Sequence, residues 1–164
     1  KINKTKMYNQ FLFISEYNKK DKPFIKFQKK LLIFINLYIS SSKKKLYILL
    51  RNKIGLEQKE EIEFYKKIFQ SDCVFLGSLK IKKNYEILDK FENIIFMKST
   101  LGLEAIARKK KVAIFSPDKV QKLKYYFGWP VKKKKNYNFF SSKKISFNEI
   151  KRVLGNISNC SQAN

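Results

Sequence analysis

The sequence contains no histidine, and this absence excludes several kinds of chemistry within the chain. Catalytic triads of the Ser-His-Asp or Cys-His type need an imidazole base, and many zinc sites need an imidazole ligand. Only two cysteines are present, Cys73 in an apolar run and Cys160 in a polar tail, so neither a disulfide framework nor a zinc cluster is indicated. This cysteine usage fits a reducing compartment, and we expect the protein to be cytoplasmic.

Arginine is scarce although the chain is strongly basic. There are 37 Lys and Arg residues against 13 Asp and Glu, a net charge of +24, but only three of the basic residues are Arg. Planar, bidentate recognition of phosphates and bases favours Arg over Lys. Lys, Asn, Ile, Phe and Tyr, whose codons are rich in A and T, supply 90 of the 164 residues. Base composition of the genome therefore explains the lysines better than a nucleic-acid surface does, and we do not expect a nucleic-acid partner.

Long hydrophobic runs are also missing. The longest apolar stretch, residues 31–39, is interrupted by Asn36 and is far shorter than the ~20 residues that span a bilayer. With 44% hydrophobic and 30% charged residues, the composition is that of a globular protein of single-domain size. We expect one domain over residues 1–164, in which residues 117–142 form an irregular region rich in basic and aromatic side chains.

Short apolar runs alternate with stretches of helical periodicity along the chain. The apolar runs, which suit strands buried on both faces, cover residues 11–14, 46–50, 73–76, 94–97 and 112–115. Helical spacing is found within residues 24–38, 62–69, 87–91, 101–108 and 146–157, and Ser146 and Glu149 have the spacing of a capping box. This alternation predicts an α/β fold, a Rossmann-like open parallel sheet with helices on both faces.

Polar residues follow each predicted strand. They are Ser15 and Glu16, Arg51 and Asn52, Gly77 and Ser78, Ser99 and Thr100, and Ser116 and Asp118. In open α/β sheets, ligands bind beyond the carboxyl ends of the strands, near the point where the strand order reverses. These residues therefore form a candidate ligand rim, although the same residue types also terminate strands and cap helices.

The segment that points most clearly to a ligand site runs from Asn93 to Arg108. A strand leads into Ser99 and Thr100, and Gly102 lets a ligand approach a helical turn whose free N–H groups attract phosphate. With Thr100 as the N-cap, Glu104 comes one position too late for a capping box and suits hydrogen bonds from ribose hydroxyls. The alternative is structural: Ser99 or Thr100 only caps, Gly102 permits close helix packing, and Glu104 favours the helix dipole.

The same segment carries a family resemblance. Residues 96–108, followed by 111–116, resemble the C-terminal nucleotide-sugar half of GT-B fold glycosyltransferases, in particular bacterial surface-carbohydrate and capsule polysaccharide biosynthesis proteins. Supporting segments are residues 11–17, 46–51, 127–130 and 138–140. The position before Ser99 is often acidic in similar sequences, whereas here it is Lys98.

The resemblance implies a site and a substrate. Ser99, Thr100 and the backbone of Gly102 would hold the diphosphate of a nucleotide sugar, and Glu104 would bind its ribose. Ser15 and Arg51 would line the cleft. We expect the nucleotide sugar as donor substrate, no cofactor, and no metal, with lysines neutralising the departing diphosphate. The resemblance does not identify a catalytic residue.

The resemblance also implies partners. GT-B enzymes bind the acceptor in an N-terminal half, so we expect a fragment that lacks this domain. The acceptor would be a carbohydrate or a lipid-linked sugar, and the basic charge favours peripheral association with the anionic inner face of the membrane. Two alternatives stay open: a basic nucleic-acid-binding module, for which residues 132–140 interleave lysines with aromatics, and a non-catalytic partner subunit that retains the fold.

Overall fold

The structure is a computed structural model that describes residues 7–69, 73–77, 81–115, 140–142 and 144–160. Most of the predicted irregular region 117–142, including the motif at 127–130, lies outside the described residues.

The strands form one parallel sheet. They are β1 (Met7–Ile14), β2 (Leu46–Leu49), β3 (Cys73–Leu76), β4 (Phe91–Phe96), β5 (Lys111–Phe115) and β6 (Ser141–Ser142). Their order is β3-β2-β1-β4-β5-β6, and every neighbouring pair is parallel. The sequence-based prediction of a Rossmann-like α/β fold is confirmed. The strand order reverses between β1 and β4, which makes their carboxyl ends the expected place for a ligand.

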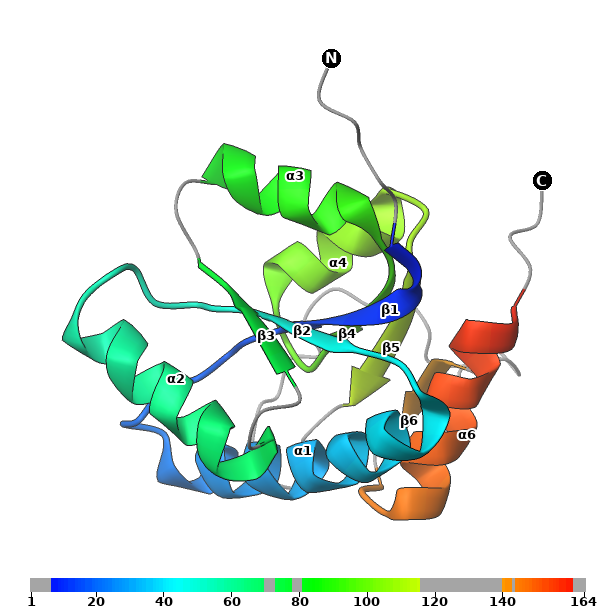
Figure 1. The fold of residues 1–164 in the computed structure, drawn as a ribbon, viewed down its shortest axis with the longest axis horizontal. Coiled ribbons are helices and arrows are strands. Elements are labelled where there is room, and N and C mark those ends of the chain that lie inside the picture. Colours follow the sequence, from blue (N-terminus) through cyan, green and yellow to red (C-terminus); the bar gives the residue numbers. More distant parts are fainter. Residues whose placement is uncertain (1–6, 70–72, 78–80, 116–139, 143, 161–164) are drawn as a thin grey trace, which may run out of the picture.

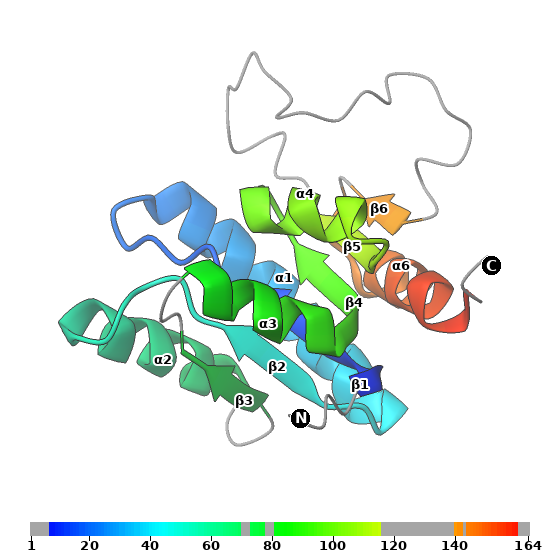
Figure 2. The same cartoon turned by 90° about the horizontal axis from the view of Figure 1, so that it is seen from above.

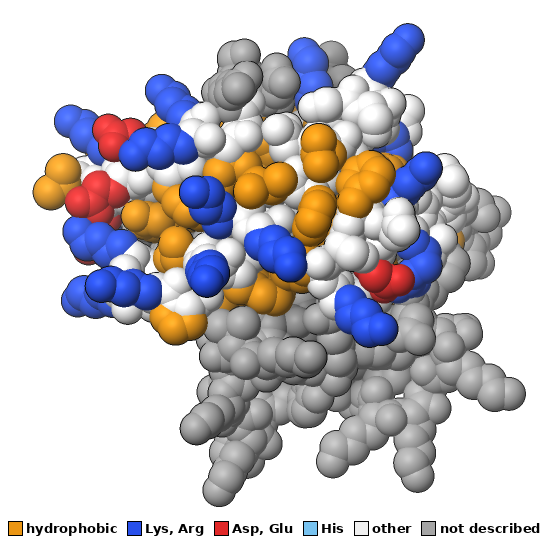
Figure 3. Space-filling view, turned by 90° about the horizontal axis from the view of Figure 1, so that it is seen from below, with side chains coloured by type: hydrophobic (Ala, Val, Ile, Leu, Met, Phe, Trp, Pro, Cys, Tyr) orange, Lys and Arg blue, Asp and Glu red, His pale blue; other side chains and the backbone are white. Residues whose placement is uncertain are grey.

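Helices cover both faces of this sheet, as predicted. The helices of the described residues are α1 (Lys22–Ser42), α2 (Leu56–Phe69), α3 (Ile81–Lys90), α4 (Thr100–Ala107) and α6 (Phe147–Asn159). One layer contains α1, α2 and α6, and the opposite layer contains α3 and α4 (Figures 1 and 2). The outer surface of the α1 layer presents lysines and hydrophobic side chains together (Figure 3).

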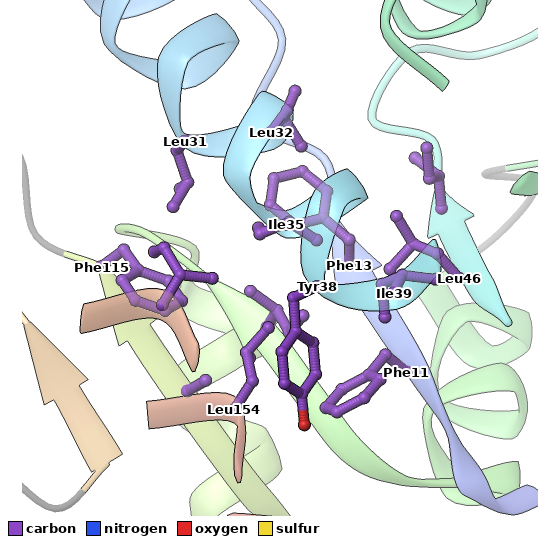
Figure 4. Packing of buried hydrophobic residues seen from close by; sticks show 14 of the residues in the cluster. Phe11, Phe13, Leu31, Leu32, Ile35, Tyr38, Ile39, Leu46, Phe115 and Leu154 are labelled. Carbon is purple, nitrogen blue, oxygen red and sulfur yellow. The ribbon is translucent and has the colours of Figure 1, made fainter. Parts of the chain in front are cut away.

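Alternation of side chains along β1 divides the core between the two layers. Phe11 and Phe13 point toward α1, where Figure 4 shows Phe13 near Ile35 and Phe11 near Tyr38. Leu12 and Ile14 point to the other face and pack with residues of α3 and α4. Successive side chains of a strand point to opposite faces, so a continuous apolar run builds two cores at once.

The structure differs from the sequence-based prediction in a strand boundary, a strand and a helix cap. Phe91 was expected on a helix, but it is the first residue of β4, where it is buried and pairs with Met7 of β1. β6 was not predicted. The Ser146 hydroxyl caps α6 by accepting from the Glu149 N–H, but the Glu149 carboxylate does not complete the capping box. Instead it accepts hydrogen bonds from Ser142 and Arg152.

Candidate functional site

The helix that follows β4 begins with unpaired backbone donors. Ser99, not Thr100 as predicted, is the N-cap of α4, and its side chain makes no capping hydrogen bond. Among the described residues, the N–H groups of Thr100, Leu101 and Gly102 have no acceptor. Unpaired donors and the positive end of the helix dipole make such a turn an attractive site for an anion. This turn lies at the carboxyl edge of the sheet, beside the point where the strand order reverses.

Glu16 joins the end of β1 to the turn that precedes α4. Its side chain is only 6% exposed, and its Oε1 accepts hydrogen bonds from the N–H groups of Met97 at 2.9 Å, Lys98 at 2.7 Å and Ser99 at 2.9 Å. Its Oε2 is buried and has no partner among the described residues. Burial raises the pKa of Glu16, although the three N–H groups and the charge of Lys98 act in the opposite direction. The turn is therefore fixed from within the protein.

The Lys98 side chain reaches toward the start of α1. Its Nζ lies 3.9 Å from the centroid of the Phe24 ring and 3.9 Å from Oδ2 of Asp21, the N-cap of α1. A lysine at this position thus has a local role as a cation over an aromatic ring. It also places a positive charge at the edge of the sheet near the open end of α4.

Ser15 belongs to a buried hydrogen-bond network. Its hydroxyl donates to Oε1 of Glu61 and accepts from the Tyr65 hydroxyl at 2.7 Å, and Tyr65 in turn accepts from Gln28. Ser15 is 4% exposed. This differs from the predicted cleft-lining position, because the groups that Ser15 contacts are part of the core.

Arg51 is exposed beyond the carboxyl end of β2. Its backbone N–H donates to Glu61 at 2.9 Å, and its guanidinium Nη1 donates to the Tyr17 carbonyl at 3.3 Å. Residues 51–57 line an open surface hollow of about 400 Å³ at this point. Ser15 and Arg51 are thus brought together by Glu61, with Arg51 on the outer side.

Gly102 has a packing reason to be glycine. A Cβ at this position would lie 2.2 Å from Cγ of the Phe96 ring, closer than any real contact. The structural explanation considered for this residue therefore applies, and the absence of a side chain allows α4 to pack on β4. The Gly102 N–H still belongs to the open first turn.

Glu104 is exposed on α4, and its carboxylate contacts a side chain of α3. The Tyr85 hydroxyl forms a hydrogen bond with the Glu104 carboxylate, and this bond raises the pKa of Tyr85. The sequence did not indicate Tyr85. One hydrogen bond leaves this carboxylate with further acceptor positions, since it has about four lone-pair sites.

Two buried glutamates have structural roles that the sequence analysis did not assign: Glu61 was not singled out, and Glu16 was named only as part of the candidate ligand rim. Glu61 accepts from the N–H groups of Arg51 and Asn52 and from the Asn52 side chain, and it is fully buried. Glu61, Tyr65 and Phe69 share the buried face of α2 at a spacing of four residues. In the sequence, the feature that could have pointed to Glu61 is a carboxylate on an otherwise apolar helical stripe. For Glu16, the signal was an acidic residue directly after an apolar strand.

Comparison with known proteins gives one family and a shared fold. A family described as "putative O-antigen biosynthesis protein" matches residues 1–164. A search of curated proteins found no match. Among solved structures, the chain is similar to TarM, with a TM-score of 0.58 and 14% identity. It is also similar to a "putative UDP-N-acetylglucosamine 2-epimerase from Listeria monocytogenes", with a TM-score of 0.55 and 8% identity.

Both similarities extend over nearly all of this chain but over only part of each solved structure. The alignment covers 94% of this chain and 29% of TarM, and 95% of this chain and 40% of the epimerase. The chain therefore spans well under half the length of these proteins. At such low identity the similarity shows the fold, and it agrees with the predicted Rossmann-like half of a GT-B architecture.

Proposed function

This chain belongs to the O-antigen biosynthesis family that matches it from end to end, and from that premise we propose that it is the donor-binding half of a glycosyltransferase. In this proposal a nucleotide sugar binds at the carboxyl edge of the sheet. Its diphosphate lies over the first turn of α4, and the sugar is transferred to the hydroxyl of a carbohydrate or lipid-linked acceptor.

The open first turn of α4 carries the proposal. Three consecutive N–H groups without acceptors, at the point where the strand order reverses, form an arrangement that suits a phosphate group. Glu16 supports this arrangement because it takes up the three preceding N–H groups and leaves those of residues 100–102 available. Lys98 and Arg51 add positive charge at the same edge.

The remaining residues suit the other parts of the donor. Glu104 is exposed one helical turn beyond the open end, where its carboxylate would accept hydrogen bonds from the ribose hydroxyls. Tyr85 holds this carboxylate from the α3 side. Arg51, on the other side of β1, lines the surface hollow at the end of β2.

The chemistry assigned to this chain is stabilisation of the leaving group. When the acceptor oxygen bonds to the anomeric carbon, the bond from that carbon to the diphosphate oxygen breaks, and negative charge develops on the diphosphate. Fixed N–H donors at a helix end stabilise such charge without reorganising during the reaction. The acceptor site and the group that removes the acceptor proton would come from a further domain.

A charge introduced at the open turn tests this function. Thr100 is exposed at the first position of α4, where the helix dipole stabilises a negative charge. Thr100→Glu is therefore expected to leave folding intact. The same carboxylate would repel a diphosphate, and we expect affinity for UDP, CDP or GDP, measured by titration calorimetry, to fall at least tenfold. Asn148→Glu adds the same charge to the first turn of α6 and is the matched control. Equal affinity of both variants for the nucleotide that the unsubstituted protein binds would contradict the proposal.

A further inference from the structure

The outer face of α1 combines lysines with exposed apolar side chains. Its 21 residues contain no Asp or Glu. Lys26, Lys29 and Lys30 are exposed in the first half of the helix. Ile33 and Leu37 follow in the second half and are 44% and 52% exposed. Large apolar residues at this exposure are not needed for the core, which α1 reaches with its opposite side.

These side chains lie along one line of the helix. Residues 26, 30, 33 and 37 are separated by four, three and four positions, a spacing that places them on one face. Beyond the end of α1, Lys43 is exposed as its C-cap. On this face the apolar pair therefore follows two lysines, Lys26 and Lys30. α1 lies between α2 and α6 in its layer, and Figure 3 shows hydrophobic side chains gathered among lysines on this side of the molecule.

We propose that this face of α1 binds the surface of an anionic lipid bilayer. Lysines near such a surface are attracted by acidic headgroups, and apolar side chains beside them enter the boundary between headgroups and acyl chains. A nucleic acid would use the lysines but would leave Ile33 and Leu37 exposed to water. A helix with lysines, no acidic residues and an apolar pair matches both the negative charge of the headgroups and the apolar boundary beneath them.

The geometry keeps the candidate site accessible in this orientation. α1 covers one face of the sheet, whereas the open turn of α4 lies at its carboxyl edge (Figures 1 and 2). No helix among the described residues has the length and apolar character needed to cross a membrane, so this contact is one with the membrane surface. A donor-binding edge beside a lipid surface also suits a lipid-linked acceptor.

Vesicle sedimentation of the chain tests the proposal. We expect binding to vesicles of phosphatidylcholine and phosphatidylglycerol in equal parts, and little binding to pure phosphatidylcholine. Lys26→Glu with Lys30→Glu is expected to lower the partition coefficient about 25-fold or more, since each lysine contributes roughly fivefold near an anionic surface. Ile33→Ser with Leu37→Ser is expected to lower it about tenfold through lost apolar contact.

Matched controls separate this face from general charge and hydrophobicity. Lys83→Glu with Lys90→Glu makes the same charge change on α3, on the opposite side of the sheet. Ile54→Ser with Leu56→Ser removes two side chains that are even more exposed, at 77% and 71%; Ile54 lies in the loop before α2, and Leu56 is the first residue of that helix. Both control pairs are expected to bind vesicles like the unsubstituted chain.

Three outcomes would overturn the proposal. One is equal loss of vesicle binding in the control and α1 variants, which would show that net charge alone is responsible. Another is unchanged binding after Ile33→Ser with Leu37→Ser. The third is a dimer in size-exclusion chromatography that the Ile33 and Leu37 substitutions convert to a monomer, which would show that a second copy of the chain covers this face.

Discussion

Oε1 of Glu16 lies 2.7 Å from the backbone nitrogen of Lys98, a residue 82 positions away in the sequence. This contact, with those to Met97 and Ser99, fixes the loop after β1 against the loop after β4. These are the two loops at which the strand order reverses. A buried carboxylate thus sets the shape of the candidate site without being exposed in it.

The buried state of Glu16 predicts how stability changes with pH. Because its pKa is raised in the folded protein, the folded state binds a proton more tightly than the unfolded state does. The contribution of Glu16 to the free energy of unfolding therefore decreases as the pH rises from its ordinary pKa to its raised pKa. Glu16→Gln keeps an oxygen for the three N–H groups and does not titrate. In urea unfolding at several pH values, we expect the unsubstituted protein to lose stability relative to Glu16→Gln over this window.

Stability should depend on pH in the opposite direction for Glu149, which therefore serves as the control. Hydrogen bonds from Arg152 and Ser142 lower its pKa in the folded protein. The contribution of Glu149 to the free energy of unfolding is present above its ordinary pKa. This contribution is lost as the pH falls through the lowered pKa of the folded protein. Relative to Glu149→Gln, the unsubstituted protein should therefore lose stability on acidification. The same pH trend for both comparisons would show that the burial of Glu16 does not have the effect described.

Gly102→Ala should destabilise the fold. The added Cβ would overlap the Phe96 ring, so α4 or β4 must shift, and we expect a loss of about 1–3 kcal/mol in the free energy of unfolding. Gly155 of α6 has no atom within 4 Å of the corresponding Cβ position. Gly155→Ala should therefore stabilise by about 0.5–1 kcal/mol through helix propensity. Denaturant unfolding of both variants measures the difference, and equal effects would contradict this account of Gly102.

Tyr65→Phe should cost about 1–3 kcal/mol of stability, because it leaves buried partners in the Ser15 network without the hydroxyl they contact. The Tyr65 hydroxyl donates to Ser15 and accepts from Gln28, and all three side chains are buried. Tyr47→Phe is the control, since Tyr47 is a partly buried residue whose hydroxyl has no hydrogen bond among the described residues. Urea unfolding should show little change for Tyr47→Phe. A comparable loss in both variants would argue that the ring environment, and not the network, is responsible.

Glu104→Ala tests the ribose contact. If the carboxylate accepts hydrogen bonds from ribose hydroxyls, its loss should weaken nucleotide binding by about 1.5–3 kcal/mol, measured by titration calorimetry with UDP, CDP and GDP. Tyr85→Phe removes the hydrogen bond to Glu104 but keeps the carboxylate, and a smaller loss is expected. Unchanged affinity of Glu104→Ala for all three nucleotides would remove Glu104 from the site.

The sequence by itself determined the elements whose signal is local. Continuous apolar runs such as residues 11–14 and 112–115 predicted strands buried on both faces, and they became β1 and β5. Ser146 at the start of an apolar helical stripe predicted the cap of α6. Periodicity and capping depend on neighbours within about one helical turn, so they can be read along the chain.

Only the tertiary structure decided which distant groups satisfy each other. Phe91 fits a helical stripe by spacing, but pairing with Met7 places it in β4. The roles of Glu16 and Glu61 depend on which strand ends are adjacent, and this follows from a strand order that no local pattern encodes. A buried N–H group must find an acceptor wherever the fold supplies one. For the loops of this candidate site, the acceptors are two carboxylates whose partners are determined by the sheet.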